Sequence, residues 1–243
     1  MLPPDLRTAE AETREALRSA LAADPRGRWT VELRFEGLRL LAPVLRLAAA
    51  LEADAVAFRL LFSDAGAAAL ARRDGPALAE RIASFSDQLR RQGAEAAGAG
   101  DDQAAGSDEL LLLVGASQSD YEEVETLCQA HRGPVVLINP GLEDAAVGIG
   151  SVARQRRRGF LALWKAAYAL IPQAATALRR CHPDDWELYR LDPDGYRFAG
   201  RFDHRPDAEE QESALAAGVP ASTASGLAAT LRSVDRLLEG LQN

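Results

Sequence analysis

Apolar and polar positions follow two alternating periods along the chain. Residues 6–21 carry apolar side chains at helical spacing, whereas residues 29–35 alternate strictly between apolar and polar, as in a half-buried strand. Helical spacing returns over residues 40–51, and a strand-like apolar run follows at 55–62. This exchange of patterns predicts βαβ units and a sheet with substantial parallel character.

Two fully apolar runs mark the predicted centre of that sheet. The predicted strand at 109–115 is apolar on both faces after Glu109, which is typical of a central parallel strand covered by helices on each side, and the next strand, predicted at 135–139, is a short apolar run that ends at Asn139. A helix capped near Ser117 and reaching Ala130 is predicted between them. A short strand is also predicted at 81–85.

The pattern changes after Arg158. A segment at 160–171, which contains Trp164 and Tyr168, ends at Pro172, and short strands separated by turns then replace the helix and strand alternation. Strands are predicted at 177–181, 186–191 and 196–202, and Asp192-Pro193-Asp194-Gly195 is a hairpin turn. These antiparallel strands are expected either to extend the same sheet or to form an added small sheet.

The predicted fold class is α/β: a Rossmann-like three-layer domain with a mixed sheet, an antiparallel β-rich C-terminal extension and a terminal helix. Residues 1–206 are predicted to form a single domain, in which the Gly-, Ala- and Asp-rich stretch 93–107 is a flexible loop. Residues 207–243 are predicted to be a polar linker, which reaches residue 222, and a C-terminal amphipathic helix from about Ser225.

Composition narrows the classes of partner. The net charge of −8 argues against binding nucleic acid through a general basic field. Cys128 and Cys181 are isolated from each other, as expected of reduced thiols in a cytoplasmic protein. Charged residues interrupt the most apolar stretch, 38–62, so at most a peripheral membrane contact is expected.

Small and polar residues follow three of the predicted strands. Asp64 and Gly66 come after the strand at 55–62, Ser117 after the strand at 109–115, and Asn139 ends the strand at 135–139. If these strands are parallel, the three loops meet at one edge of the sheet, where open α/β sheets bind ligands. Asp64 is equally well explained as a plain helix cap.

Arginines are concentrated after the last of these loops. Gly148 and Gly150 allow close backbone approach, and Arg154, Arg157 and Arg158 follow within a few residues. Two interpretations remain open: a solvated basic helix face, or a set of guanidinium groups that binds a carboxylate or phosphate. No phosphate-loop or dinucleotide motif accompanies them.

Five segments then occur in a characteristic order along the chain. They are Asp64-Ala-Gly-Ala-Ala-Ala-Leu-Ala-Arg72, Asn139-Pro140-x-Leu142-x-Asp144, Gly148-Ile-Gly150, Arg154-Gln-x-Arg157 and Leu178-Arg-Arg-Cys181-x-Pro183-x-x-Trp186. Together they resemble an uncharacterised-domain family of cyanobacteria and plastids, whose plant members include the low-photosystem-II-accumulation proteins. The resemblance covers roughly residues 2–206 and leaves the segment after Gly218 outside.

The resemblance implies a non-enzymatic role in photosystem biogenesis, as a carrier or scavenger of tetrapyrroles such as chlorophyll or haem precursors and breakdown products. Arg154, Arg157 or Arg158 could then hold the propionates, and Trp164, Tyr168 or Trp186 could stack on the flat ring. No obligatory cofactor and no metal site are expected beyond such a bound tetrapyrrole. The neighbours Cys181 and His182 could ligate its metal, but turn residues at a strand end explain them better.

Two alternatives to the carrier stay open. One is a photosystem II assembly factor that acts through protein contacts, and the other is a phosphometabolite- or nucleotide-dependent enzyme on a Rossmann-like scaffold. The expected location is the cytoplasm of a cyanobacterium, with association at the thylakoid surface as an option.

Overall fold

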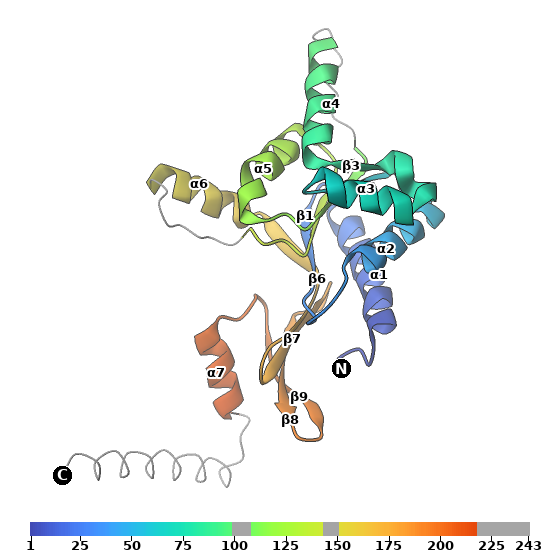
Figure 1. Cartoon of the computed structure of the whole chain (residues 1–243). Coiled ribbons are helices and arrows are strands. Elements are labelled where there is room, and N and C mark those ends of the chain that lie inside the picture. Colours follow the sequence, from blue (N-terminus) through green and yellow to red (C-terminus); the bar gives the residue numbers. More distant parts are fainter. Residues whose placement is uncertain (99–107, 143–150, 218–243) are drawn as a thin grey trace, which may run out of the picture.

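The computed structural model of the chain describes residues 1–98, 108–142 and 151–217. Within these residues, nine strands form one mixed sheet. The side chains of residues 95–98 and 151–154 are not part of this description. The strand order is β3-β2-β4-β5-β1-β6-β7-β8-β9, and Figure 1 shows β7, β8 and β9 below β6. The first six strands in that order are parallel: β3 (Ile82–Ser84), β2 (Phe58–Phe62), β4 (Leu110–Val114), β5 (Val135–Ile138), β1 (Arg28–Leu33) and β6 (Trp164–Pro172). The remaining three are antiparallel: β7 (Thr176–Cys181), β8 (Trp186–Asp192) and β9 (Gly195–Phe202).

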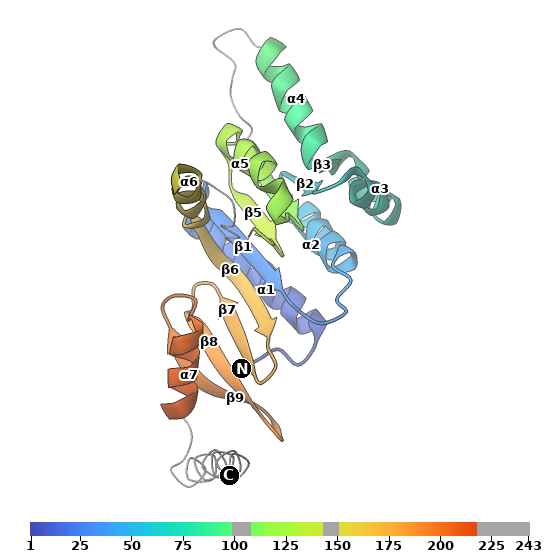
Figure 2. The same ribbon diagram turned by 60° about the vertical axis from the view of Figure 1, so that its left-hand side comes forward.

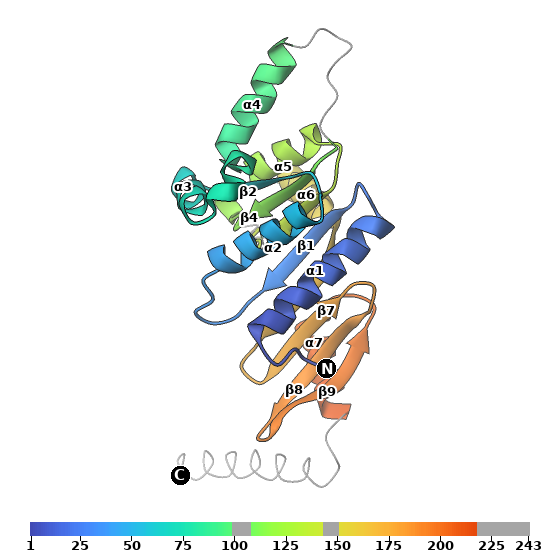
Figure 3. The same cartoon turned by 90° about the vertical axis from the view of Figure 1, so that its right-hand side faces the viewer.

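Helices cover both faces of the sheet (Figures 2 and 3). One face, called here the α1 face, carries α1 (Leu6–Ala23), α2 (Leu41–Ala53) and α3 (Ala65–Asp74). The opposite face, called the α6 face, carries α4 (Phe85–Gly98), α5 (Tyr121–Ala130), α6 (Ser151–Leu161) and, over the antiparallel strands, α7 (Ala208–Ala217). The predicted α/β fold with a mixed sheet is therefore confirmed.

Burial of the strands follows the sequence pattern. Every residue of β4 and β5 is buried, because helices cover both of their faces. Along β1 the strict alternation turns Trp29, Val31 and Leu33 toward the α1 face, and Thr30 and Glu32 toward the α6 face.

The antiparallel strands extend the sheet beyond β6, which is the first of the two arrangements that the sequence left open. The turn between β8 and β9 lies at the predicted Asp192–Gly195, where Gly195 has a φ of +130°, a conformation that favours glycine. Helix α7 packs closely on β9, since a Cβ added at Gly200 would meet the Cβ of Ala214 at 3.3 Å.

Two predicted boundaries are wrong. Residues 93–98, predicted to be part of a flexible loop, belong to α4, whose Ala- and Glu-containing end continues the helix. Residues 208–217, predicted to be polar linker, form α7. Residues 99–107 and the helix predicted from Ser225 lie outside the described residues. Within the part that is described, no helix combines the length and apolar character needed to cross a membrane.

Candidate functional site

The connections of the sheet change direction between β1 and β5. These two strands are parallel neighbours, but β1 leads to α2 on the α1 face, whereas β5 leads toward α6 on the opposite face (Figure 2). The carboxyl ends of such a strand pair form a topological switch point, the usual place for a ligand in an open α/β sheet.

The strand order places the three predicted loops at this same edge, because β2, β4 and β5 are consecutive and parallel. Their polar side chains serve the backbone there. Asp64 accepts a hydrogen bond from the Ala67 N–H at 2.8 Å and caps α3, so Gly66 lies in the first turn of that helix. The N–H of Ser117 donates to the Asp120 carboxylate at 2.7 Å and helps to start the turn before α5.

Asn139 joins the two strands of the switch point. Its Oδ1 accepts from the Leu33 N–H at 2.6 Å, and its Nδ2 donates to the Leu33 carbonyl at 2.7 Å. The amide of Asn139 is therefore occupied by the end of β1 and holds the edge together.

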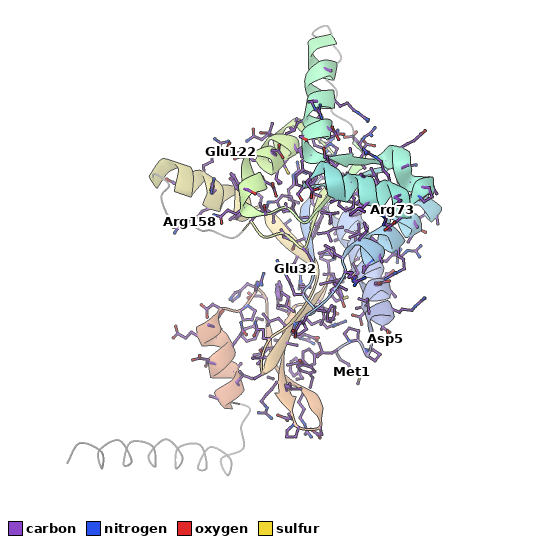
Figure 4. The ribbon with its side chains drawn as sticks, viewed as in Figure 1. Met1, Asp5, Glu32, Arg73, Glu122 and Arg158 are labelled. Carbon is purple, nitrogen blue, oxygen red and sulfur yellow. The ribbon has the colours of Figure 1, made fainter. Side chains whose placement is uncertain are left out.

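A groove of about 220 Å³ opens on the α6 face beside this edge. It is lined by Thr30, Glu32, Arg34, Leu137, Pro140, Leu142, Leu161, Trp164 and Arg205. Figure 4 shows Glu32 near the middle of the molecule, at a level between α6 and α7. We call this the switch-point groove.

Two guanidinium groups share one buried carboxylate in this groove. Nε of Arg34 lies 3.2 Å from Glu32 Oε2, and Nη1 of Arg205 lies 3.1 Å from Glu32 Oε1. The Glu32 side chain is only 7% exposed, whereas those of Arg34 and Arg205 are 37% and 51% exposed. The three charged residues of the lining sum to one net positive charge, which suits an anionic ligand.

Further contacts fix both arginines. Arg34 also donates to the carbonyl of Pro140, and Arg205 lies over the ring of Trp186 at 5.6 Å. Arg34 follows β1 of the parallel part, whereas Arg205 follows β9 of the antiparallel part. The groove thus combines residues from both parts of the sheet.

The two described arginines of the predicted cluster, Arg157 and Arg158, lie on α6 and do not line the switch-point groove. Arg157 stacks on the ring of Tyr121, 4.5 Å from its centroid, at the start of α5. Arg158 also lies on α6, where Figure 4 labels it, and it is not a free guanidinium group because it has an interaction partner. Arg156 forms an ion pair with the buried Glu125 of α5, so this part of α6 packs on α5 through its charges. Gly148 and Gly150 lie outside the described residues, and the side chain of Arg154 is not described.

Trp164 and Tyr168, both predicted to be ligand-binding residues, lie on opposite faces of the sheet. Trp164 lines the groove and packs edge-on against Phe160. Tyr168 is fully buried on the α1 face, where its hydroxyl donates to Glu12 at 2.9 Å. The cause is a register shift in β6: Ala166 pairs with Thr30 but Tyr168 pairs with Val31, so the alternation of faces inverts between them.

Metal-binding chemistry has little support among the described residues, where no group of three or more His, Cys, Asp or Glu side chains is placed to hold an ion. Burial raises the pKa of the Cys128 thiol to about 12, which disfavours the thiolate that a metal needs. His182 packs edge-on against Trp29, and its Nδ1 lies 3.3 Å from the Ser19 hydroxyl of α1. Neither Cys181 nor His182 lines the switch-point groove.

Reasoning from the sequence missed the three charged residues of the groove. Glu32 and Arg34 were visible on the polar side of the alternating strand, but a polar face normally indicates solvent. The useful signal would have been that β1 is central in the sheet, which makes a charged side chain there unusual. Nothing in the sequence marked Arg205 as a site residue, because it lies in a polar segment after the last strand.

Comparison with known proteins identifies the family. Residues 3–213 match the family described as a domain of unknown function, DUF1995. None of the curated proteins and none of the solved structures matches the chain. The match covers most of the chain, and the chain therefore belongs to the DUF1995 family.

Proposed function

We propose that the protein is a non-enzymatic binder of a carboxylate-bearing tetrapyrrole, acting as a carrier or scavenger, and that the switch-point groove receives the acidic edge of the ring. The observation that carries the proposal is the sharing of the buried Glu32 carboxylate by Arg34 and Arg205. Each guanidinium offers five N–H donors, and these contacts use only some of them. Two planar donor groups on one side of a groove suit a ligand with paired carboxylates.

An apolar wall supports the same ligand class. Trp164, Leu142 and Leu161 line the groove beside the two arginines. An aromatic ring stacks well on tryptophan, and apolar side chains exclude water from its edge. The groove volume of about 220 Å³ is below the roughly 300–1,000 Å³ of sites that enclose a drug-sized ligand, so the proposal places only the propionate-bearing edge inside.

The photosynthetic setting belongs to the proposal as well. It follows from the resemblance described above, and it includes a cyanobacterial origin, the thylakoid surface as a place of work and photosystem biogenesis as the process. A tetrapyrrole carrier fits this setting because chlorophyll and haem precursors are reactive when free.

The test is an absorbance titration of the full chain with protoporphyrin IX, followed at the Soret band. Arg205→Gln and Arg34→Gln should each weaken binding roughly 10- to 100-fold, since each removes a charge-assisted hydrogen-bonding group. Arg73→Gln is the matched control, because Arg73 is an exposed arginine on α3, paired with Asp74 and remote from the groove (Figure 4).

A second ligand separates the acidic edge from the ring. Octaethylporphyrin has the same macrocycle without carboxylates, so it should bind much more weakly than protoporphyrin IX. Equal binding of the two porphyrins, or unchanged binding in both arginine variants, would overturn the proposed site. Absence of any Soret shift with protoporphyrin IX would overturn the proposed function.

A second candidate function is favoured by one observation on the antiparallel strands. Leu191, Tyr196 and Phe198 are exposed large apolar residues on β8 and β9, at 45%, 40% and 56% exposure. Such a patch suits a protein contact, as expected of an assembly factor. A Tyr196→Ser/Phe198→Ser variant should then lose a photosystem subunit in a pull-down while keeping porphyrin binding.

The third alternative, a phosphometabolite- or nucleotide-dependent enzyme, depends on Gly148, Gly150 and Arg154 and stays a prediction.

A further inference from the structure

A second cavity lies on the α1 face of the same strand pair. It has a volume of about 200 Å³ and lies between α1 and α2. Its floor is formed by Val31 and Leu33 of β1 and Ile138 of β5, and its walls include Leu40, Val44 and Leu47. The cavity is therefore separated from the switch-point groove by the sheet itself.

The interior of this cavity contains no buried polar group that needs a hydrogen bond from a ligand. Thr13 is the one buried polar side chain in the lining, and its hydroxyl already donates to the Ala9 carbonyl at 2.7 Å. A hollow with apolar walls and no unsatisfied polar group excludes water and accepts hydrocarbon. An engineered apolar cavity of about 150 Å³ binds benzene, so the larger hollow of about 200 Å³ accepts a single ring or a medium-length acyl chain.

Arginines surround the mouth, and two of them are neutralised. Arg46 forms a two-pronged ion pair with Glu10, and Arg14 forms one with Asp54. Both pairs join α1 to the α2 segment and brace the walls of the cavity. Arg7 is different: its guanidinium makes no hydrogen bond or ion pair with the residues that the structure describes, although its charge helps to lower the pKa of Asp5.

We infer that the α1–α2 cavity is a binding site for a free medium-chain carboxylate, with the hydrocarbon chain on the floor of Val31, Leu33 and Ile138 and the carboxylate at Arg7. Charge complementarity selects the anion, because the lining with Asp54 included keeps one net positive charge. The apolar floor selects the chain, since burial of each CH₂ group is favourable. This inference is independent of the porphyrin proposal.

Isothermal titration of the full chain with octanoate tests the site. Saturable binding is expected, while octan-1-ol and acetate should bind at least tenfold more weakly, because one lacks the charge and the other lacks the chain. Arg7→Gln should weaken octanoate binding roughly tenfold, and Arg73→Gln should leave it unchanged.

A variant that fills the hollow makes the test specific. Ala50 lines the cavity from α2, so Ala50→Leu should abolish octanoate binding while the thermal unfolding midpoint stays the same or rises. Ala49→Leu is the matched control, because Ala49 is exposed on the same helix and does not line the cavity. Arg205→Gln should also bind octanoate normally, which keeps this site distinct from the groove. Absence of saturable binding at millimolar octanoate, or full binding by Ala50→Leu, would overturn the inference.

Discussion

The side chain of Asn139 pairs with the backbone of Leu33 as a neighbouring strand would, with hydrogen bonds of 2.6 Å and 2.7 Å to its N–H and carbonyl. The backbone of Asn139 has a φ of +48°, and its own N–H donates to Val31 at 2.8 Å. One residue therefore turns the chain out of β5 and completes the hydrogen-bonding ladder at the end of β1.

Replacement of Asn139 by alanine should lower the free energy of unfolding by about 3–4 kcal/mol. Two hydrogen bonds of about 1 kcal/mol each are lost, and a Cβ without a polar group costs roughly 1–2 kcal/mol at positive φ. Asn139→Gly should cost less, because glycine adopts this conformation freely. Urea denaturation measures both, and an equal loss in the two variants would contradict the role of the backbone conformation.

Replacement of Glu32 by glutamine should strengthen binding of an anion in the switch-point groove. The net charge of the lining rises by one, and because Arg34 and Arg205 at the groove are partly exposed to solvent, this favours an anion by only about 1 kcal/mol, or roughly fivefold. Stability should fall by about 1–3 kcal/mol at the same time, because two charge-assisted hydrogen bonds weaken. The titration uses protoporphyrin IX, with Glu122→Gln on the exposed surface of α5 as control. Weaker binding by Glu32→Gln would contradict this prediction. It would show that the Glu32 carboxylate matters more for holding the two arginines in position than for neutralising their positive charge.

Replacement of Arg28 should loosen the end of α5. Its guanidinium donates to the carbonyls of Gly133, Cys128, His131 and Arg26 at 2.9–3.2 Å. Arg28→Lys keeps the charge but cannot reach four acceptors, so a loss of about 1–3 kcal/mol is expected in urea denaturation. The exposed Arg26→Lys serves as control and should change little.

Stability should fall on acidification through Glu187. Burial alone would raise the pKa of Glu187, but hydrogen bonds from Tyr189 and Arg179, at 2.7 Å and 3.1 Å, outweigh it and hold the pKa below its usual 4.5. A carboxyl group with a lowered folded pKa stabilises the protein above its unfolded pKa. That contribution is lost as the pH falls from about 4.5 through the lowered value.

The measurement is the thermal unfolding midpoint as a function of pH, for the parent chain and for Glu187→Gln. The variant should be less stable at neutral pH, and its midpoint should fall less steeply below pH 4.5. Parallel curves for the two proteins would contradict the assignment.

Burial also lowers the pKa of His131, whose Nε2 lies 2.7 Å from the Glu109 carbonyl. A separate loss of stability is therefore expected at higher pH, as the pH falls below 6.5, and the same pH series of unfolding midpoints measures it.

The sequence was informative where the physical signal is local. Continuous apolar runs located β4 and β5, strict alternation located β1, and Asp192-Pro193-Asp194-Gly195 located the β8–β9 turn. Small residues after strands located the loops of Asp64, Ser117 and Asn139, since a chain that leaves a parallel strand for a helix needs them. Their common edge followed once the strands were taken as parallel.

The groove could not be read from the sequence, because its members meet only in three dimensions. Arg205 reaches Glu32 because β1 is central and the chain returns across the α6 face after β9. Trp164 and Tyr168 are separated by an irregular register that no residue type between them signals. The packing of α7 against Gly200 of β9 could likewise not be predicted, because the sequence of α7 is polar and resembles a linker.

The central place of β1 also has a consequence for the order in which the chain folds. Arg28 pairs with Val135 on one side and with Trp164 on the other, so both neighbours of β1 are synthesised about a hundred residues or more after it. Such distant pairings make folding slow, because loop closure must precede the contacts that reward it. During translation one edge of β1 stays unpaired until β5 is complete at residue 138, and the other edge stays unpaired until β6 is complete at residue 172. Chaperone dependence should therefore be greatest in the middle of synthesis and should end when β6 is delivered.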